Sequence, residues 1–381
     1  MKILFTVEFY EPHKGGAEEV VKQLAERLAK KEHSVTIATS FLNERTFLEL
    51  NRVKIEGFKI SGNIVNGITG NKNEIEKYRR FLRGDFDVII NYAAQIWTTD
   101  LAFDVLNDIT AKKVLVPCGY SGLKNHAYIE YFKKLPDYLK KYDKLVYMSP
   151  NYQDKIFGDK NMVGDKAVII PNGASEEEFL NEDKFNIRKK LGIKTKYLVI
   201  SVSNHYKAKG HAFVVDAFRK MKRNDITLLI VGEKFVSYGF RKIAHFFLDY
   251  LQCRFFSLVN KNIKLVDGKN RDLVVSAYKN ADLFLFGSKV ECAPLVMYES
   301  FASKTPFITT NVGNVSDHAG YLKIVSSPNE MSDVANNLLN NEKKREELIE
   351  KAFQLWKENH TWRGIAGRYE GLFASLVSRR E

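Results

Sequence analysis

The alternation of apolar runs, glycine loops and helical segments constrains the fold of this chain more than any other feature. KILFTV at 2–7 is a strand-like run, and the glycine pair at 15–16 follows it. Apolar residues then recur at helical spacing over 17–31, and HSVTIATS at 33–40 predicts a second strand. Strand, loop, helix and strand in this order predict the first unit of a parallel α/β sheet.

The pattern starts again at Tyr197, where YLVISVS predicts a strand and HAFVVDAFRKM a helix. Two doubly wound units are the simplest account of the whole chain. The expected junction is PNGASEEEF at 171–179, because its proline, asparagine and glycine interrupt regular structure. Further strands are predicted in both halves, at 87–92, 113–118, 226–232, 263–268, 281–287 and 306–310.

The composition excludes several classes of protein. With 381 residues and a hydrophobic fraction of 45%, the chain can fill the cores of two ordinary domains and is not of the disordered class. The net charge of +13 indicates either an anionic partner or simply solvated lysines. We expect no nucleic-acid partner, because the sequence contains no recognised RNA- or DNA-binding module.

The cysteines and the lengths of the apolar runs indicate the compartment. Cys118, Cys253 and Cys292 are widely separated and form neither a disulfide framework nor a zinc spacing, which indicates a reducing compartment. The N-terminal apolar run is too short for a signal peptide, and no run approaches the ~18 apolar residues of a membrane-spanning helix. We expect a cytoplasmic protein whose contact with a membrane is peripheral.

The loop NHYKAKG at 204–210 lies between a predicted strand and the start of a helix. Lys207 and Lys209 therefore stand at a helix N-terminus, where free N–H groups and the helix dipole attract anions. The loop matches neither of the two common glycine-rich phosphate motifs. It is either a phosphate site or a merely basic loop.

VECAPLVMYES at 290–300 places two acids, Glu291 and Glu299, in a mostly apolar run. Pro294 is suited to the first turn of a helix, and an acid near that end is stabilised by the dipole. Because a buried acid is costly without a partner, Glu299 either has a structural role or binds ligand hydroxyl groups. The backbone N–H groups that could bind an anion there are those of Ala293, Leu295 and Val296.

Six short motifs in order resemble those of a known family, the retaining glycosyltransferases of the GT-B fold in glycosyltransferase family four. The resemblance covers nearly the whole chain. The motifs are GG at 15–16, PNG at 171–173, KG at 209–210, VGE at 231–233, E-x7-E at 291–299 and ITTNVGN at 308–314.

The resemblance implies two Rossmann-like domains that face each other across a cleft. It implies an acceptor-side domain at 1–171, a nucleotide-sugar domain at 172–360 and a terminal helix at 361–381 that crosses back to the first domain. The apolar residues of that helix, on one side, are Trp362, Ile365, Tyr369, Leu372 and Phe373.

The same resemblance assigns roles to individual residues. Lys209 would contact the donor diphosphate, Glu291 the sugar ring and Glu299 the ribose hydroxyl groups. The amides of residues 293–296 would hold the sugar and phosphate. The remaining donor-site residues would be Gly232 and Glu233 with the turn at Asp267 and Gly268 near the base, and Gly15 and Gly16 from the first domain.

The implied reaction is the transfer of a hexose-type sugar with retention of configuration. The donor would be UDP- or GDP-linked, and the acceptor a glycan or lipid carrier in the synthesis of a cell-surface polysaccharide such as lipopolysaccharide. No metal or other cofactor is expected, because a lysine and helix N-termini would stabilise the leaving diphosphate. The alternative is a noncatalytic nucleotide-sugar-binding or partner protein on the same scaffold.

The chain departs from the family pattern at two positions. Asn204 stands where many members have an arginine, and Lys207 is the residue that could compensate. Cys118 stands where many have a histidine near the donor sugar, so Cys118 is a candidate catalytic residue and His126 a possible substitute. His33 fits the turn before the second strand, where a structural role is expected.

Two further stretches leave alternatives open. Residues 125–147 are rich in tyrosine and lysine, and residues 239–260 carry six aromatic side chains with few charges. Each stretch either covers a domain core or lies in a membrane interface. A third stretch, Asp85-Phe86-Asp87, resembles a D-x-D metal motif but simply precedes a predicted strand.

Overall fold

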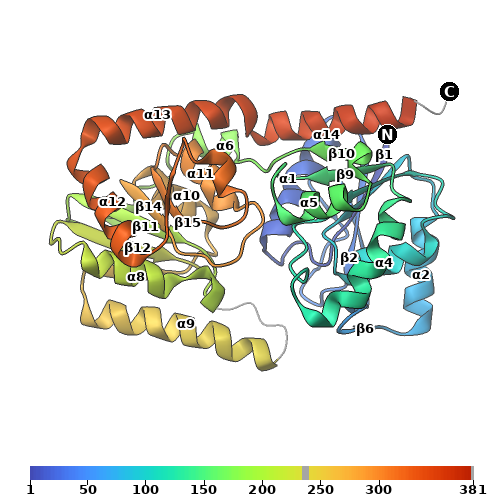
Figure 1. The fold of residues 1–381 in the computed structure, drawn as a ribbon, viewed down its shortest axis with the longest axis horizontal. Helices are drawn as coiled ribbons and strands as arrows, with labels where there is room; N and C mark the ends of the chain where they lie inside the picture. Colours follow the sequence, from blue (N-terminus) through green and yellow to red (C-terminus); the bar gives the residue numbers. More distant parts are fainter. Residues whose placement is uncertain (234–239, 379–381) are drawn as a thin grey trace. The chain divides into compact units, whose positions relative to one another are not determined.

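The computed structural model describes residues 1–233 and 240–378, and the side chains of all of these except 240–247. The chain divides into two compact units (Figure 1). Unit 1 consists of Met1–Asn172 and Trp362–Glu381, and unit 2 consists of Gly173–Thr361. Each unit is an α/β structure built on a mainly parallel sheet, which confirms the predicted fold class.

Unit 2 contains a six-stranded parallel sheet in the order β13-β12-β11-β14-β15-β16. The strand order reverses at the neighbours β11 and β14, where Val199 lies opposite Leu283. Ligands of open α/β sheets bind outside the carboxyl ends of the strands at such a reversal. The strands are β11 (Tyr197–Val202), β12 (Ile226–Val231), β13 (Ile263–Val266), β14 (Leu283–Phe286), β15 (Phe307–Thr310) and β16 (Lys323–Val325). All but β16 were predicted from the sequence.

Helices cover both faces of this sheet (Figure 1). Alternate residues of β11 point to opposite faces, so Leu198 and Ile200 join one apolar core while Val199 joins the other. On the first face lie α6 (Glu176–Phe179), α10 (Arg271–Lys279), α11 (Leu295–Ala302) and α13 (Glu342–Asn359). On the second lie α8 (His211–Lys220), α9 (Phe240–Val259) and α12 (Pro328–Asn340).

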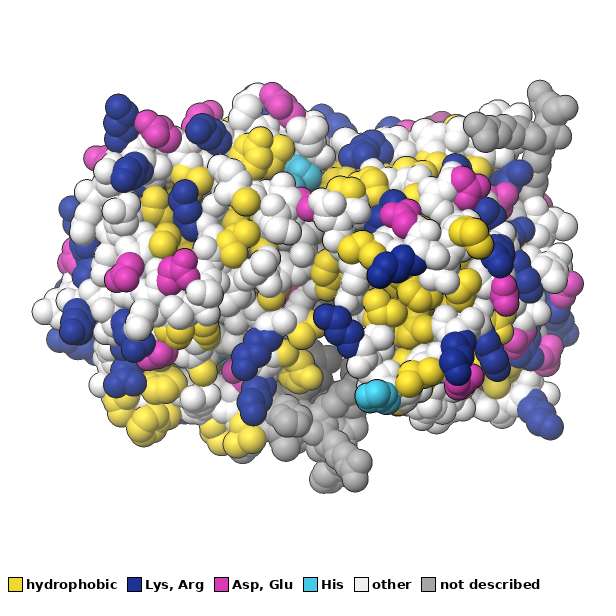
Figure 2. All heavy atoms as spheres, viewed as in Figure 1, with side chains coloured by type: hydrophobic (Ala, Val, Ile, Leu, Met, Phe, Trp, Pro, Cys, Tyr) yellow, Lys and Arg dark blue, Asp and Glu magenta, His cyan; other side chains and the backbone are white. Residues whose placement is uncertain are grey.

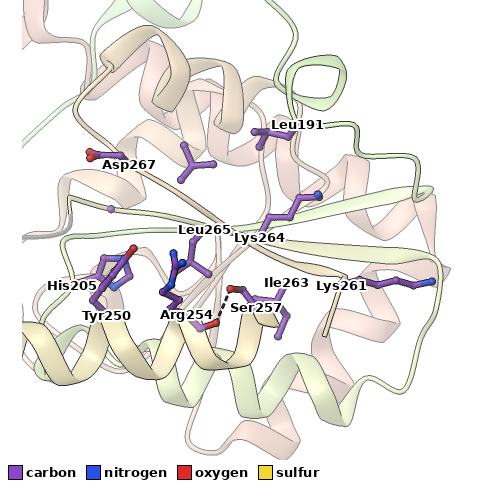
Figure 3. A pocket seen from close by; sticks show the side chains of 12 residues that line it. Leu191, His205, Tyr250, Arg254, Ser257, Lys261, Ile263, Lys264, Leu265 and Asp267 are labelled. Carbon is purple, nitrogen blue, oxygen red and sulfur yellow. Dashed lines mark hydrogen bonds between the residues drawn. The ribbon is translucent and has the colours of Figure 1, made fainter. Parts of the chain in front are cut away.

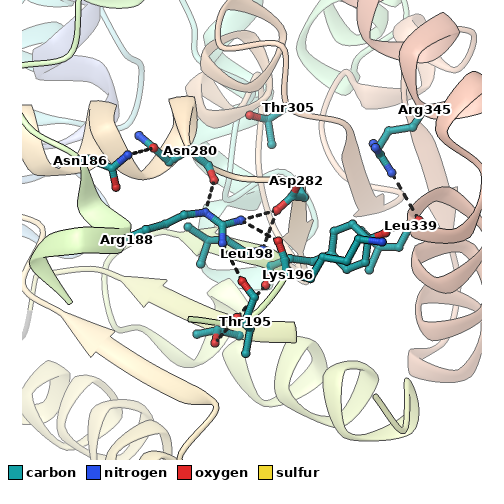
Figure 4. A network of polar contacts seen from close by, with 12 residues as sticks. Asn186, Arg188, Thr195, Lys196, Leu198, Asn280, Asp282, Thr305, Leu339 and Arg345 are labelled. Atoms are coloured by element: carbon teal, nitrogen blue, oxygen red, sulfur yellow. Dashed lines mark hydrogen bonds and ion pairs between the residues drawn. The ribbon is translucent and has the colours of Figure 1, made fainter. Parts of the chain in front are cut away.

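A polar network fixes the amino ends of β11 and β14 (Figure 4). Arg188, in α7 (Ile187–Lys190), forms an ion pair of 2.6 Å with Asp282, whose carboxylate also accepts a bond from the Leu198 amide. Burial raises the pKa of Asp282 above its usual value, and these bonds offset part of that effect. The network is structural and leaves the carboxyl ends of the strands for a ligand.

Unit 1 contains an eight-stranded sheet in the order β10-β9-β8-β7-β1-β2-β4-β3, parallel except for β3. The strands are β1 (Lys2–Thr6), β2 (Ser34–Ser40), β3 (Glu49–Leu50), β4 (Val53–Phe58), β7 (Val88–Tyr92), β8 (Lys112–Val116), β9 (Lys144–Tyr147) and β10 (Ala167–Ile169), beside the hairpin β5 (Ser61–Asn63) and β6 (Gly67–Thr69). The helices are α1 (Gly16–Lys30), α2 (Lys72–Leu82), α3 (Trp97–Ala102), α4 (Ile129–Leu139), α5 (Gln153–Lys160) and α14 (Trp362–Val377).

The terminal helix α14 packs against α1 within unit 1. Glu370 accepts bonds from Lys31 at 2.5 Å and from His33 at 2.9 Å, so the structural role predicted for His33 is confirmed. The apolar side of α14 is buried as predicted, except that Leu372 is only half-buried and Leu376 joins the buried set. Residues 379–381 of the expected helix lie outside the described residues.

Aromatic residues of the 125–147 stretch belong to the core of unit 1. Tyr131, Tyr142 and Tyr147 are buried there, and Tyr138 stacks on Phe103 at 4.3 Å between ring centroids. The core alternative for this stretch is therefore confirmed. The Asp85-Phe86-Asp87 segment is also structural, because Asp85 pairs with the Lys2 side chain and Asp87 accepts a bond from the Lys2 amide.

Asp154 provides a test of the packing of unit 1. Its buried carboxylate accepts a 2.9 Å bond from the Gly119 amide, and burial raises its pKa to about 6. Between about pH 4 and pH 6 the folded state therefore binds a proton that the unfolded state has lost, so the contribution of Asp154 to stability falls as pH rises.

We expect wild type to lose about 2 kcal/mol of stability relative to Asp154→Asn between pH 4 and pH 7. Urea denaturation of both proteins at the two pH values measures this difference. A difference that is independent of pH would show that the Asp154 carboxyl keeps an ordinary pKa.

Candidate functional site

Two loops meet at the carboxyl ends of β11 and β14. The amide of Lys289 donates a 2.7 Å bond to the carbonyl of Ala208. Gly210 has a left-handed φ of 71°, and a Cβ there would lie 1.9 Å from the carbonyl oxygen of Gly287. Only glycine allows this approach, so the KG motif is what brings the two loops together.

The contact between the loops joins two predicted site residues. Lys209 is at the end of the short helix η4 (Lys207–Lys209), and its Nζ lies 2.8 Å from Oε1 of Glu291. The same oxygen accepts a 2.7 Å bond from the Ser288 hydroxyl. The side chains of Lys209 and Glu291 are 31% and 13% exposed, so both can reach a ligand from fixed positions.

The N-terminus of α11 lies directly after this pair. Pro294 is the capping residue with ψ of 121°, whereas the sequence placed it in the first turn, so the helix begins one residue later than predicted. The N–H groups of Leu295 and Val296 belong to the first turn, where the helix offers them no acceptor. The loop after β15 supports this region, because the Asn314 amide donates to the carbonyl of Cys292 at 2.8 Å.

Glu299 is buried in α11 and has a cationic partner. Arg271 Nη2 lies 2.5 Å from Oε1 of Glu299, and the same guanidinium binds Glu178 through two bonds of 2.6 and 2.9 Å. Burial and the nearby Glu299 carboxylate raise the pKa of Tyr278. A carboxylate has about four acceptor sites, so Glu299 can still accept bonds from a pair of hydroxyl groups.

Sequence reasoning missed Arg271 and Glu178. The burial of Glu299 signalled that a cation was needed, but Arg271 is 28 residues away in the chain, at the start of α10. No local motif marks that position. The fold brings it close to Glu299 only because α6, α10 and α11 lie on the same face of the sheet.

The expected base-binding residues also come together. A Cβ on Gly268 would lie 3.4 Å from Cα of Gly232, so the Asp267–Gly268 turn lies against the end of β12. A cavity of about 390 Å³ opens beside them, within the size range of small-molecule sites (Figure 3). The residues that line it include His205, Gly232, Tyr250, Arg254, Lys264 and Asp267.

The remaining predicted residues lie in the loops that follow strands or at the start of a helix. Asn204 is half-buried after β11, Lys207 is exposed in η4, and Glu233 is half-buried after β12. Gly15 caps α1 and Gly16 is its first residue, both in unit 1.

Cys118 follows β8 in unit 1 with a φ of 58°. Burial raises the pKa of its thiol, so the group is protonated at neutral pH and is a weak nucleophile. His126 is exposed at the start of the short helix η2 (His126–Tyr128).

One group of side chains within the described part of the chain could hold a metal ion. It consists of His205, His211, Asp249 and Cys253, all buried in unit 2. It does not include the predicted donor-site residues.

Comparison with known proteins identifies relatives of the chain. Residues 183–355 match the family of glycosyl transferases group 1. The chain is 25% identical to lipopolysaccharide 1,2-N-acetylglucosaminetransferase of Salmonella typhimurium strain LT2 over 227 residues. These aligned residues cover 57% of this chain and 58% of that protein. The chain is also 28% identical over 220 residues to N-acetyl-alpha-D-glucosaminyl L-malate synthase of Bacillus anthracis. That alignment covers 55% of this chain and 53% of the relative. The chain thus spans little more than half the length of these curated relatives.

The solved structures show the fold. HepE from Anabaena, crystallised in complex with UDP, superposes with a TM-score of 0.80 over 98% of this chain and 100% of that one, at 15% identity. The fold is GT-B, as the sequence predicts. The narrower assignment to glycosyltransferase family four stays a prediction.

The glycine contact between the loops can be tested by substitution. Gly210→Ala adds a Cβ at a left-handed position against the Gly287 carbonyl, so we expect a loss of about 3 kcal/mol in stability. Gly371→Ala is the matched control, because Gly371 is exposed in α14 with open space around it. The control should gain about 0.5–1 kcal/mol. Equal melting temperatures for the two variants would contradict the proposed loop contact.

Proposed function

We propose that this chain is a retaining, metal-independent glycosyltransferase. Its residues 183–355 match the family of glycosyl transferases group 1. It moves a hexose-type sugar from a UDP- or GDP-linked donor to a glycan or lipid-linked acceptor of a cell-surface polysaccharide. The observation that carries this proposal is the Lys209–Glu291 pair, held where the sheet order reverses and next to the N-terminus of α11. The name of the Salmonella relative supports lipopolysaccharide as the class of product.

The pair and the helix suit the departure of a nucleoside diphosphate. The bond between the anomeric carbon and the diphosphate oxygen breaks, and negative charge develops on that oxygen. Lys209 and the amides of Leu295 and Val296 stabilise this charge, because the fold already places them next to one another. The acceptor oxygen bonds to the same face of the anomeric carbon, and its proton passes to a donor phosphate oxygen.

Two carboxylates orient the donor. Glu291 is held by Lys209 and Ser288 and approaches the sugar ring, while Glu299 accepts bonds from the ribose hydroxyl groups. The ion pair with Arg271 holds the Glu299 carboxylate in one orientation, which is what a hydroxyl pair requires of its acceptor. Cys118, if it takes part, acts as a neutral thiol and not as a nucleophile.

Donor binding tests the site. Thermal-shift measurements with UDP-, GDP-, ADP- and CMP-sugars should show stabilisation by one class of donor, because a ligand of the folded state raises the melting temperature. Lys209→Ala should weaken that binding roughly tenfold to a hundredfold, as expected for the loss of a charge-assisted bond. Lys289→Ala, an exposed lysine in the facing loop, is the matched control and should bind normally.

Measuring the release of nucleoside diphosphate from the donor that binds separates the two candidate functions. A transferase releases the nucleoside diphosphate by hydrolysis or by transfer to an acceptor, whereas a noncatalytic binding protein gives the thermal shift alone. The absence of any shift with all four classes of donor would contradict both.

The outer face of α9 supports peripheral contact with an anionic membrane. The exposed Arg254 lies on this helix together with exposed apolar side chains, and the exposed Lys261 follows soon after the helix ends, so both basic residues could complement acidic lipids. Figure 2 shows hydrophobic side chains gathered over α9. The exposed residues are Leu248, Leu251, Phe255, Leu258 and Val259. Of the 239–260 stretch, Gly239 and the side chains of 240–247 lie outside the described residues.

The membrane contact is peripheral in this proposal. Within the described ranges, no helix is both long enough and apolar enough to cross a membrane. A lipid-linked acceptor at the inner face of the cell membrane would be reached from such a position.

Flotation with liposomes tests this contact. The wild-type chain should float with anionic vesicles at low salt, and Phe255→Ser with Leu258→Ser should reduce binding roughly tenfold or more, since each buried CH₂ contributes ~0.8 kcal/mol. Leu48→Ser with Met162→Ser removes two equally exposed apolar side chains from unit 1 and should leave flotation unchanged. If wild type fails to float, or both double variants float equally, α9 is not the membrane surface.

A further inference from the structure

We propose that His205, His211, Asp249 and Cys253 form a zinc site that fastens α9 to the loop carrying Lys207 and Lys209. The potential ligand atoms of the four side chains all lie within 4.8 Å of one another. None of the four residues is more than 5% exposed. The site adjoins the cavity that His205 lines, and the proposal does not depend on the proposed transferase activity.

The set of ligands fits zinc. Two imidazoles, a thiolate and a carboxylate are all groups that zinc binds, and four protein ligands complete the tetrahedral coordination of a structural site. Ligand atoms around such an ion are roughly 3 to 4 Å apart, given bonds of about 2.0–2.3 Å. The cluster needs only a small adjustment to reach that spacing, because all of its potential ligand atoms already lie within 4.8 Å of one another.

The hydrogen bonds assign the coordinating atoms. Nδ1 of His211 and Nδ1 of His205 lie 2.7 and 3.1 Å from the same oxygen of Asp249. Nε2 of His211 is 2.9 Å from the Ser203 hydroxyl, which acts as the outer partner that metal-bound histidines usually have. Zinc would therefore take Nδ1 of both rings and Oδ2 of Asp249.

The alternative is a hydrogen-bonded His–Asp–His network without a metal. That network explains the positions of the two histidines and Asp249 but does not explain why the thiol of Cys253 lies beside them. Asp249 and Cys253 are four residues apart on α9, so they present their side chains on one helix face toward the histidines. A thiol at that position completes a set of four ligands, and this is the observation that favours a metal.

The position of the cluster suggests what the ion does. His205 and His211 flank η4, and α9 contacts η4, α8 and β13. A bound ion would tie these elements together directly behind the loop of Lys209. We infer a structural zinc that rigidifies the loop, and no step of the reaction passes through it.

Metal content tests the proposal. The full-length chain, expressed in zinc-supplemented medium and freed of loose metal by gel filtration, should contain one zinc per chain by mass spectrometry. Cys253→Ser and His211→Gln should each lose most of that zinc, whereas Cys118→Ser, the matched cysteine control, should keep it. Wild type without stoichiometric zinc, or Cys253→Ser with full zinc content, would overturn the proposal.

Cobalt substitution provides a second measurement that does not depend on a variant folding. Wild type reconstituted with Co²⁺ should show the strong visible bands of four-coordinate cobalt and a thiolate-to-cobalt charge-transfer band in the near ultraviolet. The charge-transfer band should be lost selectively in Cys253→Ser. Its absence from wild type would show that the thiol is not a ligand, and the hydrogen-bonded network would stand.

Discussion

The contact between the loops after β11 and β14 is the constraint on which the candidate site depends. Gly210 and Gly287 allow two backbones to approach more closely than any side chain would permit. This approach sets the distance between Lys209 and Glu291, and it places both beside the first turn of α11. A cation, an acid and a helix N-terminus then converge at the point where the sheet order reverses, which is where such sheets bind ligands.

The acidic residues around this point illustrate how charge is accommodated in a partly buried site. Glu291 is paired with Lys209 and Glu299 with Arg271. Asp282 is paired with Arg188 at the opposite, amino ends of the strands. Each carboxylate is thereby oriented by a cationic partner, which offsets part of its desolvation cost. At the site we propose a further consequence of the pairing: a diphosphate replaces Glu291 as the partner of Lys209 when the donor binds.

Local sequence patterns predicted β1, β2, β7 and β8 of unit 1, all strands of unit 2 except β16, and the two acids of VECAPLVMYES. Apolar runs and helix-start residues have short-range signals, whereas the short strands β3, β9, β10 and β16 and the strand β4 were missed. The short-range signals also predicted Lys209. Arg271 was not predictable, since it comes close to Glu299 only because α10 and α11 lie on the same face of the sheet. The His205–Asp249 contact was equally hidden, because it joins a loop to a helix 44 residues further along the chain. The aromatic stretch at 125–147 left two alternatives open until the packing of unit 1 placed its rings in a core.

A crystal structure of the chain with a bound nucleoside diphosphate would test the central claim most directly. The account predicts the distal phosphate within hydrogen-bonding distance of Lys209 Nζ and of the Leu295 and Val296 amides, with the ribose hydroxyl groups on Glu299. A diphosphate bound elsewhere, with Lys209 still paired to Glu291 and no ligand at α11, would contradict it.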